Sequence, residues 1–219
     1  SIISGFNVMA VITASANGDW LIGATWTGGI VPTSGDVACL NGYLVNLYDG
    51  ETITCDEIYQ GADQTSAGIG SIILKGPTLV ATSSYIINAD LYPTSTSTSS
   101  ALIENDSVGF DPLENIAFTL NGNIRRASVT GVAVFIAGGD GFNDLTVVIN
   151  GDIEQADTNN YSFFMDTSAD GDVSYTLNGN ILGSTGGYYG EIFGIGYSGN
   201  VSVTVNGYIE VTGSFSTSR

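Results

Sequence analysis

The sequence predicts an all-β protein, a right-handed parallel β-helix of about six coils of about 28 residues each, behind an N-terminal cap. Two observations support this fold class. The motif Asn-Gly-x-Ile occurs four times at nearly constant spacing, beginning at Asn121, Asn150, Asn178 and Asn206. The composition also favours strands and tight turns, because only 12% of residues are charged and 30 of the 219 are glycine.

Each motif ends a stretch in which apolar and polar residues alternate, which is typical of a strand with one buried face. The apolar positions are Ile116, Phe118 and Leu120, then Leu145, Val147 and Ile149, then Val173, Tyr175 and Leu177, then Val201, Val203 and Val205. The alternation continues through the glycine to the isoleucine. The isoleucine is therefore expected to point inward, and the glycine to mark a bend where a Cβ atom would not fit.

A second apolar segment lies between successive motifs, at residues 132–137, 161–165 and 191–196. A coil of two or three strands cannot bury its apolar face alone, so stacking of successive coils is expected. An antiparallel sandwich is the alternative architecture, but it does not explain an Asn-Gly pair at every second strand.

Stacked coils place equivalent residues above one another. The asparagines at 121, 150, 178 and 206 are therefore expected to form a structural ladder of amide hydrogen bonds, inside the stack or at its edge. Six residues before each of them the chain again has Asn or Asp, and these side chains are expected to bond the backbone of their own turn. The residues of this second column are Asn115, Asp144, Asp172 and Asn200.

The repeat continues upstream with wider spacing, through a slot at Asn88 and another at Cys55. The extra length is assigned to loops at 93–100 and 109–114. The predicted organisation is a docking or trimerising arm at 1–16, the cap and first turn at 17–54, and the coils at 55–219.

The charge balance limits the partners, because 22 acidic residues face 4 basic ones for a net charge of -18. Nucleic acid and anionic membrane surfaces both attract basic proteins, so neither is an expected partner. No apolar run reaches the ~18 residues of a membrane span, and no signal peptide is expected at residues 1–6. Cys39 and Cys55, in a chain without histidine, exclude a zinc site. They form either one disulfide or two buried free thiols.

Residues 17–47 carry a recognisable pattern, with Trp20, Thr25-Trp26, Gly28-Gly29, Val31-Pro32 and Gly35-Asp36. This pattern resembles the entry segment of many β-helix proteins, found in phage virion proteins, secreted bacterial adhesins and G8-type domains. At this place in the chain, Trp20 and Trp26 are expected to cap the open end of the stack. A sugar-stacking platform is the alternative role for the pair.

Residues suited to chemistry are few, and the chain is not expected to be an enzyme. Asp152 with Glu154, or Asp166 with Glu191, would meet the ~5–9.5 Å carboxylate spacing of glycosidases. The turn carboxylates Asp140, Asp144, Asp170 and Asp172 would suit calcium. The only basic pair, Arg125-Arg126, is expected at a coil corner, where it is either solvated or forms a salt bridge to Glu154. No triad, phosphate loop or nucleotide fingerprint is present, and no catalytic residue, metal or cofactor is expected.

The resemblance implies a structural virion protein, namely a capsid decoration (cement) or head-fibre protein. Such a protein is expected to be a homotrimer at the capsid surface, in contact with the major capsid protein or another virion protein. The alternative is a tail fibre, spike or extracellular adhesin module for host attachment, with glycan contacts from Tyr188, Tyr189 and Tyr197. A polysaccharide hydrolase is the third alternative.

Overall fold

The computed structural model describes residues 9–76, 82–94, 101–106, 115–125, 135–137, 144–154, 164–166, 171–182, 193–195 and 199–210, with the main chain alone for 135–137, 164–166, 193–195 and 209. These ranges contain strands, turns and two short 3-10 helices, η1 (Gly23–Thr25) and η2 (Thr27–Gly29), and no α-helix. The predicted all-β class is therefore confirmed. Neither described helix has the length and apolar character that a membrane span needs.

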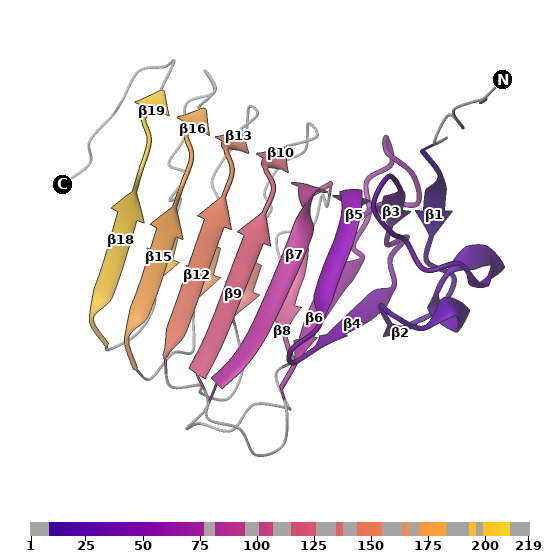
Figure 1. Cartoon of the computed structure of the whole chain (residues 1–219), viewed down its shortest axis with the longest axis horizontal. Helices are drawn as coiled ribbons and strands as arrows, with labels where there is room; N and C mark the ends of the chain where they lie inside the picture. The colour runs from indigo at the N-terminus through magenta and orange to yellow at the C-terminus, as the bar shows by residue number, and fades with distance from the viewer. Residues whose placement is uncertain are drawn as a thin grey trace, which may run out of the picture.

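Within the part of the chain that the structure describes, the strands form two sheets, and the chain passes back and forth between them (Figure 1). The larger sheet has twelve strands: β1 (Val11–Thr13), β3 (Val37–Cys39), β5 (Thr52–Tyr59), β7 (Thr82–Tyr92), β9 (Asn115–Asn121), β10 (Ile124–Arg125), β12 (Leu145–Asn150), β13 (Ile153–Glu154), β15 (Val173–Leu177), β16 (Ile181–Leu182), β18 (Val201–Val205) and β19 (Ile209–Glu210). The smaller sheet has seven: β2 (Gly18–Asp19), β4 (Leu44–Tyr48), β6 (Ser71–Lys75), β8 (Ile103–Asn105), β11 (Phe135–Ala137), β14 (Phe164–Asp166) and β17 (Phe193–Ile195).

Paired strands in both sheets run parallel and keep the register of the sequence repeat. Ile116 on β9 pairs with Leu145 on β12, which pairs with Val173 on β15, which pairs with Val201 on β18. The short strands follow the same order, since Ile124 pairs with Ile153, and Ile153 with Ile181. Equivalent residues therefore lie side by side in successive strands, an arrangement compatible with a parallel β-helix.

The N-terminal part of the chain contributes to the same two sheets. β1, within the predicted arm at 1–16, pairs with β3. β2, within the predicted cap at 17–54, pairs with β4. Residues 1–8 of the predicted arm lie outside the described residues.

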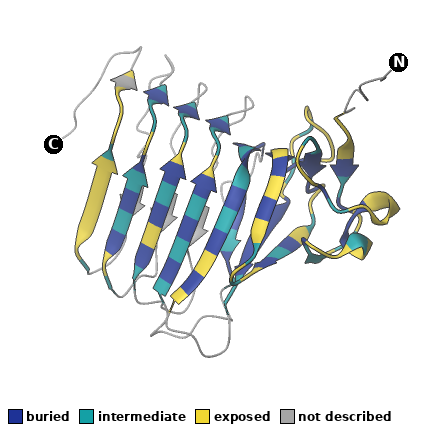
Figure 2. Ribbon diagram, viewed as in Figure 1, coloured by how far each residue is buried: buried dark blue, intermediate teal, exposed yellow. Residues whose placement is uncertain are grey.

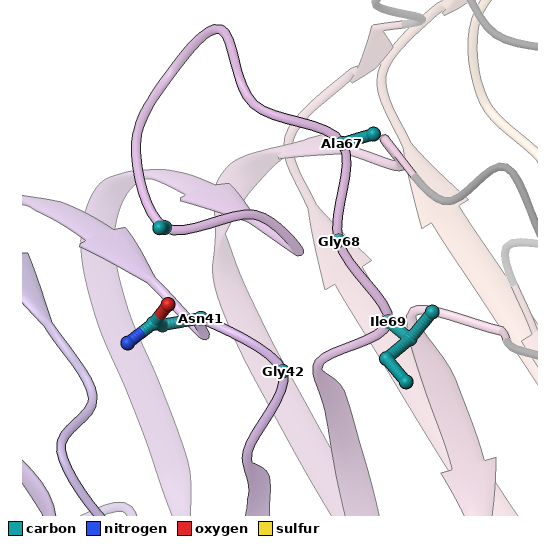
Figure 3. A pocket seen from close by; sticks show the side chains of 6 residues that line it. Asn41, Gly42, Ala67, Gly68 and Ile69 are labelled. Carbon is teal, nitrogen blue, oxygen red and sulfur yellow. The ribbon is translucent and has the colours of Figure 1, made fainter.

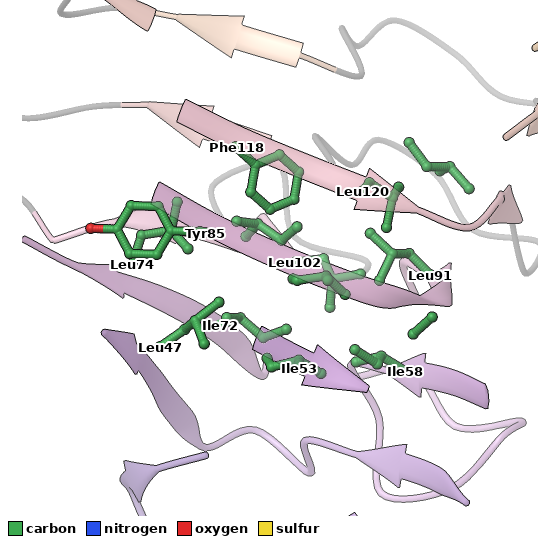
Figure 4. Packing of buried hydrophobic residues seen from close by; sticks show 14 of the residues in the cluster. Leu47, Ile53, Ile58, Ile72, Leu74, Tyr85, Leu91, Leu102, Phe118 and Leu120 are labelled. Carbon is green, nitrogen blue, oxygen red and sulfur yellow. The ribbon is translucent and has the colours of Figure 1, made fainter. Parts of the chain in front are cut away.

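The core lies between the two sheets and runs along most of the stack from Ile12 to Ile181. Figure 4 shows side chains of both sheets in this one cluster, among them Ile72 and Leu74 of the smaller sheet and Tyr85 and Leu91 of the larger. The bands of Figure 2 follow the period-two alternation along the strands. The inward residues of β9, β12 and β15 are at most 3% exposed, and the expected inward position of the motif isoleucines holds for Ile124, Ile153 and Ile181, which are also buried.

The repeat predicts that Cys55 aligns with Asn88, but the residue that pairs with Asn88 is Thr54, one position earlier. Thr54 pairs with Asn88, and the register then slips before Glu57 pairs with Asp90. This irregularity places Cys55 and Asp56 opposite Ala89, which is the two-against-one geometry of a β-bulge. Opposite this bulge β7 has an alanine, Ala89, at the position where later coils have the motif glycine.

Candidate functional site

The predicted asparagines lie in one line on the outer face of the larger sheet. Each amide nitrogen donates to the amide oxygen one coil earlier, with Nδ2–Oδ1 distances of 2.7 Å from Asn121 to Asn88, 2.7 Å from Asn150 to Asn121, 2.7 Å from Asn178 to Asn150 and 2.8 Å from Asn206 to Asn178. Asn88 in turn donates to Thr54 Oγ1 at 3.1 Å. We call these five asparagines the amide ladder. The ladder is solvent-exposed at all four motif asparagines, so each bond contributes at the low end of the ~0.5–1.5 kcal/mol typical of protein hydrogen bonds.

The motif glycines form a second line, behind the amide ladder, where backbones of adjacent coils approach closely. A Cβ atom on Gly122 would lie 2.0 Å from the carbonyl oxygen of Ala89, and one on Gly179 would lie 2.1 Å from that of Gly151. These separations are shorter than any van der Waals contact allows. Only glycine fits, and the larger sheet bends here, since β9 ends at Asn121 and β10 begins at Ile124.

The structure differs from the prediction for the column six residues earlier, which we call the turn column (Asn115, Asp144, Asp172 and Asn200). Asp144 N donates to Asn115 Oδ1 at 3.1 Å, and Asp172 N donates to Asp144 Oδ1 at 2.8 Å. Asn200 donates through both N and Nδ2 to Asp172 Oδ1, at 2.9 and 3.0 Å. The side chains of Asn115, Asp144 and Asp172 therefore each accept a hydrogen bond from the turn of the next coil. Strands spaced by ~4.8 Å bring these equivalent residues within reach.

A third column went unrecognised in the sequence pattern, at the variable position of Asn-Gly-x-Ile. Asn123 N donates to Asp90 Oδ1 at 2.8 Å, Asp152 N to Asn123 Oδ1 at 2.9 Å, and Asn180 N to Asp152 Oδ1 at 2.7 Å. We call Asp90, Asn123, Asp152 and Asn180 the corner column. Acid and amide alternate along it, so each carboxylate has an amide donor, rather than another carboxylate, in the following coil. The signal was available, since the variable position is Asn or Asp in every motif except the last, which has Tyr208.

Arg125 joins three coils beside the corner column. Its Nε donates to Asp90 Oδ2 at 2.6 Å, and its Nη1 to Glu154 Oε1 at 2.5 Å. The expected salt bridge to Glu154 is thus present, together with an unexpected one to Asp90. Burial acts to raise the pKa of Asp90, but hydrogen bonds from Arg125 and Asn123 outweigh it and leave that pKa below its ordinary value. Arg126 lies outside the described residues.

A small aromatic cluster surrounds Glu57 on the outer side of the larger sheet. The rings of Tyr59 and Tyr92 stack with centroids 4.2 Å apart, and both hydroxyls donate to the Glu57 carboxylate, at 3.0 and 3.3 Å. Burial and the Glu57 carboxylate raise the pKa of Tyr59, so its phenol stays protonated as a donor. The cluster links β5 to β7 through side-chain contacts.

Both predicted cap tryptophans are buried at the β1 end of the stack, Trp20 at 1% and Trp26 at 2% exposure. Their rings meet edge to face with centroids 4.8 Å apart, and Trp26 Nε1 donates to Trp20 O at 2.8 Å. Trp26 also forms an antiparallel bridge with Ala14. Because sugar stacking needs an exposed ring face, the alternative role as a glycan platform is wrong for this pair.

Cys39 and Cys55 are both free and buried, which decides between the two alternatives left by the sequence. Cys55 belongs to the main core, whereas Cys39 belongs to a separate cluster with Val37 and Tyr59. Burial, with nearby carboxylates, raises the pKa of Cys39 to about 11 and that of Cys55 to about 12. Both are thiols at neutral pH.

Some of the residues that the sequence suggests for catalysis or metal binding form hydrogen bonds or ion pairs with neighbouring coils. The others lie outside the described residues. Asp152 belongs to the corner column and Glu154 binds Arg125, while only the main chain of Asp166 is described. Asp144 and Asp172 belong to the turn column. Glu191, Asp140, Asp170 and the predicted glycan tyrosines at 188, 189 and 197 lie outside the described residues. Within the described ranges, no three His, Cys, Asp or Glu side chains gather closely enough to hold a metal ion.

One shallow surface pocket of about 300 Å³ lies between the turn after β3 and the loop before β6 (Figure 3). Its lining is Asn41, Gly42, Ala62, Ala67, Gly68 and Ile69. None of these side chains titrates, and the only polar one is the amide of Asn41. The lining therefore provides no group for acid–base chemistry.

Comparison of the chain with protein-family models, curated proteins and solved structures found no match.

Proposed function

We propose that the chain is a right-handed parallel β-helix of about six coils behind an N-terminal cap, and that it serves as a structural virion protein. Within that class we propose a capsid decoration (cement) or head-fibre role, held by non-covalent contacts to other virion proteins. The resemblance of residues 17–47 to β-helix entry segments supplies the virion context.

The observation that carries the proposal is the continuity of contacts along the stack. The amide ladder runs unbroken from Thr54 to Asn206, and the turn and corner columns run beside it. The main hydrophobic core follows the same direction. A mechanical force along the stack is therefore resisted by the amide ladder, the two columns and the core together. This suits a protein that reinforces a virus particle.

A surface suited to docking lies at the β1 end. Leu21, Ile22 and Ile30 are 51, 52 and 61% exposed. No charged residue occurs from 20 to 35, although the whole chain carries a net charge of -18. An exposed, uncharged aliphatic patch is typical of protein interfaces, so this end is the proposed contact with the capsid.

Labelling of the particles tests the proposal. Antibody raised against the purified chain would be applied to virions from the source material and located by cryo-electron microscopy. We expect label at regular positions on the head, at capsid subunit junctions. Label confined to the tail would favour the host-attachment role instead, and virions that contain no peptide of this chain by mass spectrometry would refute the proposal.

A further inference from the structure

Six Asn-Gly pairs occur in the chain, and the asparagine of each pair is exposed to solvent. Glycine after asparagine favours loss of the side-chain amide, because the unhindered glycine nitrogen can reach the asparagine side chain and displace ammonia. Sequence and exposure are alike at the six pairs, so the contacts around each pair decide which of them reacts in the folded protein. The pairs begin at Asn17, Asn41, Asn121, Asn150, Asn178 and Asn206.

The pairs within the amide ladder are held in place by the neighbouring coils. Asn150 donates to Asn121 and accepts from Asn178, at 2.7 Å in both cases, and those two asparagines are bonded on both sides in the same way. A Cβ atom on any of the four motif glycines would lie between 2.0 and 2.2 Å from a carbonyl oxygen of the preceding coil. Ring closure must turn the peptide group between asparagine and glycine, so here it requires local opening of the stack.

The first pair is restrained by other contacts. Asn17 Oδ1 accepts from Leu44 N at 2.9 Å. Gly18 belongs to β2, and a Cβ atom on it would lie 2.5 Å from Thr25 Oγ1. Neither the side chain nor the following peptide group is free to turn without breaking these contacts.

The second pair, Asn41-Gly42, lies in a tight turn between β3 and β4. Its φ angles are 52° and 78°, and Tyr43 N donates to Leu40 O at 2.9 Å, as in a type I′ turn. Asn41 Nδ2 donates to Ala14 O at 3.3 Å, longer than the ~2.7–3.2 Å usual for such bonds.

The peptide group between Asn41 and Gly42 is open to solvent and unrestrained. Within the described residues, neither Asn41 O nor Gly42 N takes part in a main-chain hydrogen bond. A Cβ atom on Gly42 would meet nothing within 4 Å, and both residues line the pocket of Figure 3. This pair can therefore reach the geometry for ring closure without opening of the stack.

We propose that Asn41 is a site of spontaneous deamidation, with Gly42 N as the attacking atom. Gly42 N loses its proton to hydroxide and bonds to Asn41 Cγ. The bond from Cγ to Nδ2 breaks, and the amide nitrogen takes a proton from water and leaves as ammonia. Water then opens the resulting succinimide at either carbonyl, which gives aspartate or isoaspartate. The net reaction consumes water, releases ammonia and adds one negative charge to the chain.

The product differs from asparagine at a junction of the N-terminal end. A carboxylate at position 41 has no N–H group to donate to Ala14 O. Isoaspartate also lengthens the main chain within the turn that joins the buried Leu40 to β4. The inference is independent of the proposed virion function.

Peptide mapping by mass spectrometry tests the site. The full chain is held at pH 8 and 37 °C, and conversion is followed at each pair. Asn41 should react at least tenfold faster than each of Asn17, Asn121, Asn150 and Asn178, because reaction at these four waits for local opening. In 6 M guanidinium this difference should disappear. A smaller ratio in the folded protein overturns the proposal, and so does a ratio of this size that persists in guanidinium.

Two variants of the full chain test the attacking atom. Gly42→Asn keeps a residue that tolerates positive φ, but its side chain hinders the nitrogen, so reaction at Asn41 should slow at least fivefold. Gly50→Asn makes the same change in another open turn, at φ of 77°, and should leave the rate at Asn41 unchanged. Slowing by less than fivefold in Gly42→Asn, or equal slowing in both variants, overturns the proposal.

Discussion

The carbonyl oxygen of Gly122 lies 2.2 Å from the point that a Cβ atom on Gly151 would occupy. The same relation links Gly151 to Gly179, at 2.1 Å, and Gly179 to Gly207, also at 2.1 Å. None of these glycines is among the residues of positive φ. The motif glycine is therefore required by the close approach of two backbones and not by an unusual backbone conformation.

Replacement of Gly151 by alanine should lower the free energy of unfolding by about 3 kcal/mol, because the new methyl group meets main-chain atoms that cannot move independently. Chemical denaturation at pH 7 measures this loss. Gly50→Ala is the control, since Gly50 has φ of 77° with open space around it, and conformational strain alone costs about 1 kcal/mol. A loss at Gly151 no larger than the loss at Gly50 would contradict the predicted size of the close-approach cost.

Replacement of Asn150 by alanine should cost about 1 kcal/mol, because it removes the donation to Asn121 and the bond from Asn178 at once. Thermal unfolding of both variant and wild type gives the difference. Thr146→Ala changes an exposed residue on the same strand outside the amide ladder and should shift stability by less than about 0.5 kcal/mol. A loss at Thr146 as large as that at Asn150 would contradict a stabilising role for the ladder.

Replacement of Asn123 by aspartate should lower stability by about 1–2 kcal/mol at pH 7, because three carboxylates would then stack in adjacent coils with Asp90 and Asp152. Repulsion would raise the pKa of the new carboxyl in the folded state. Stability is therefore retained below the unfolded pKa near ~3.9, and the deficit grows as pH rises through the raised pKa. Denaturation at pH 3.5, 5 and 7 measures this trend.

The matched control for that variant is Asn121→Asp, which lies two residues away between the uncharged Asn88 and Asn150. It loses one donated bond but gains no charged neighbour in its column. A pH dependence as steep as that of Asn123→Asp would argue against stacking of like charges as the cause.

Replacement of Arg125 by glutamine should cost about 1 kcal/mol near neutral pH, because both of its ion pairs are lost. The lowered pKa of Asp90 contributes stability that is present above the unfolded value and is lost as pH falls through the folded value. The difference between variant and wild type should therefore vanish in acid. A carbon-13 titration of the Asp90 carboxyl should show its pKa rising in the variant, and Arg125→Lys should keep part of the shift.

The two thiols should be inert in the folded protein. With pKa values of about 11 for Cys39 and about 12 for Cys55, almost no thiolate exists at pH 8, and burial blocks access. Ellman's reagent should report no reactive thiol in native buffer and two in 6 M guanidinium. Reaction of one thiol without denaturant would show that its cluster opens in the native state.

The sequence predicts the features that depend on alternation within a strand and on the spacing of the repeated motif. Alternation identified the inward residues of β9, β12 and β15, and the motif spacing gave their parallel register, because a periodic stack imposes the same environment on each copy. The same alternation places Gly122 at an inward position, which is why the sequence predicts that a Cβ atom would not fit there. The virion role, the oligomeric state and the glycan tyrosines stay predictions.

Features that depend on contacts between coils were harder to predict. The sequence predicts own-turn bonds for the turn column, because sequence spacing does not reveal that the Asp144 side chain lies within hydrogen-bond reach of Asp172 N. The sequence pattern does not predict the corner column, because alternating Asn and Asp at the variable position of the motif look like ordinary sequence variation. The bulge at Cys55 displaced the ladder to Thr54, and a one-residue insertion leaves no mark in the sequence pattern.

In the bonds described for the three columns, the residue later in the sequence donates and the earlier residue accepts. A ribosome releases the chain in that same order. The accepting side-chain oxygens of each coil are therefore synthesised before the N–H groups of the next coil that donate to them. In the three side-chain columns, each coil therefore supplies the acceptors on which the next coil is placed.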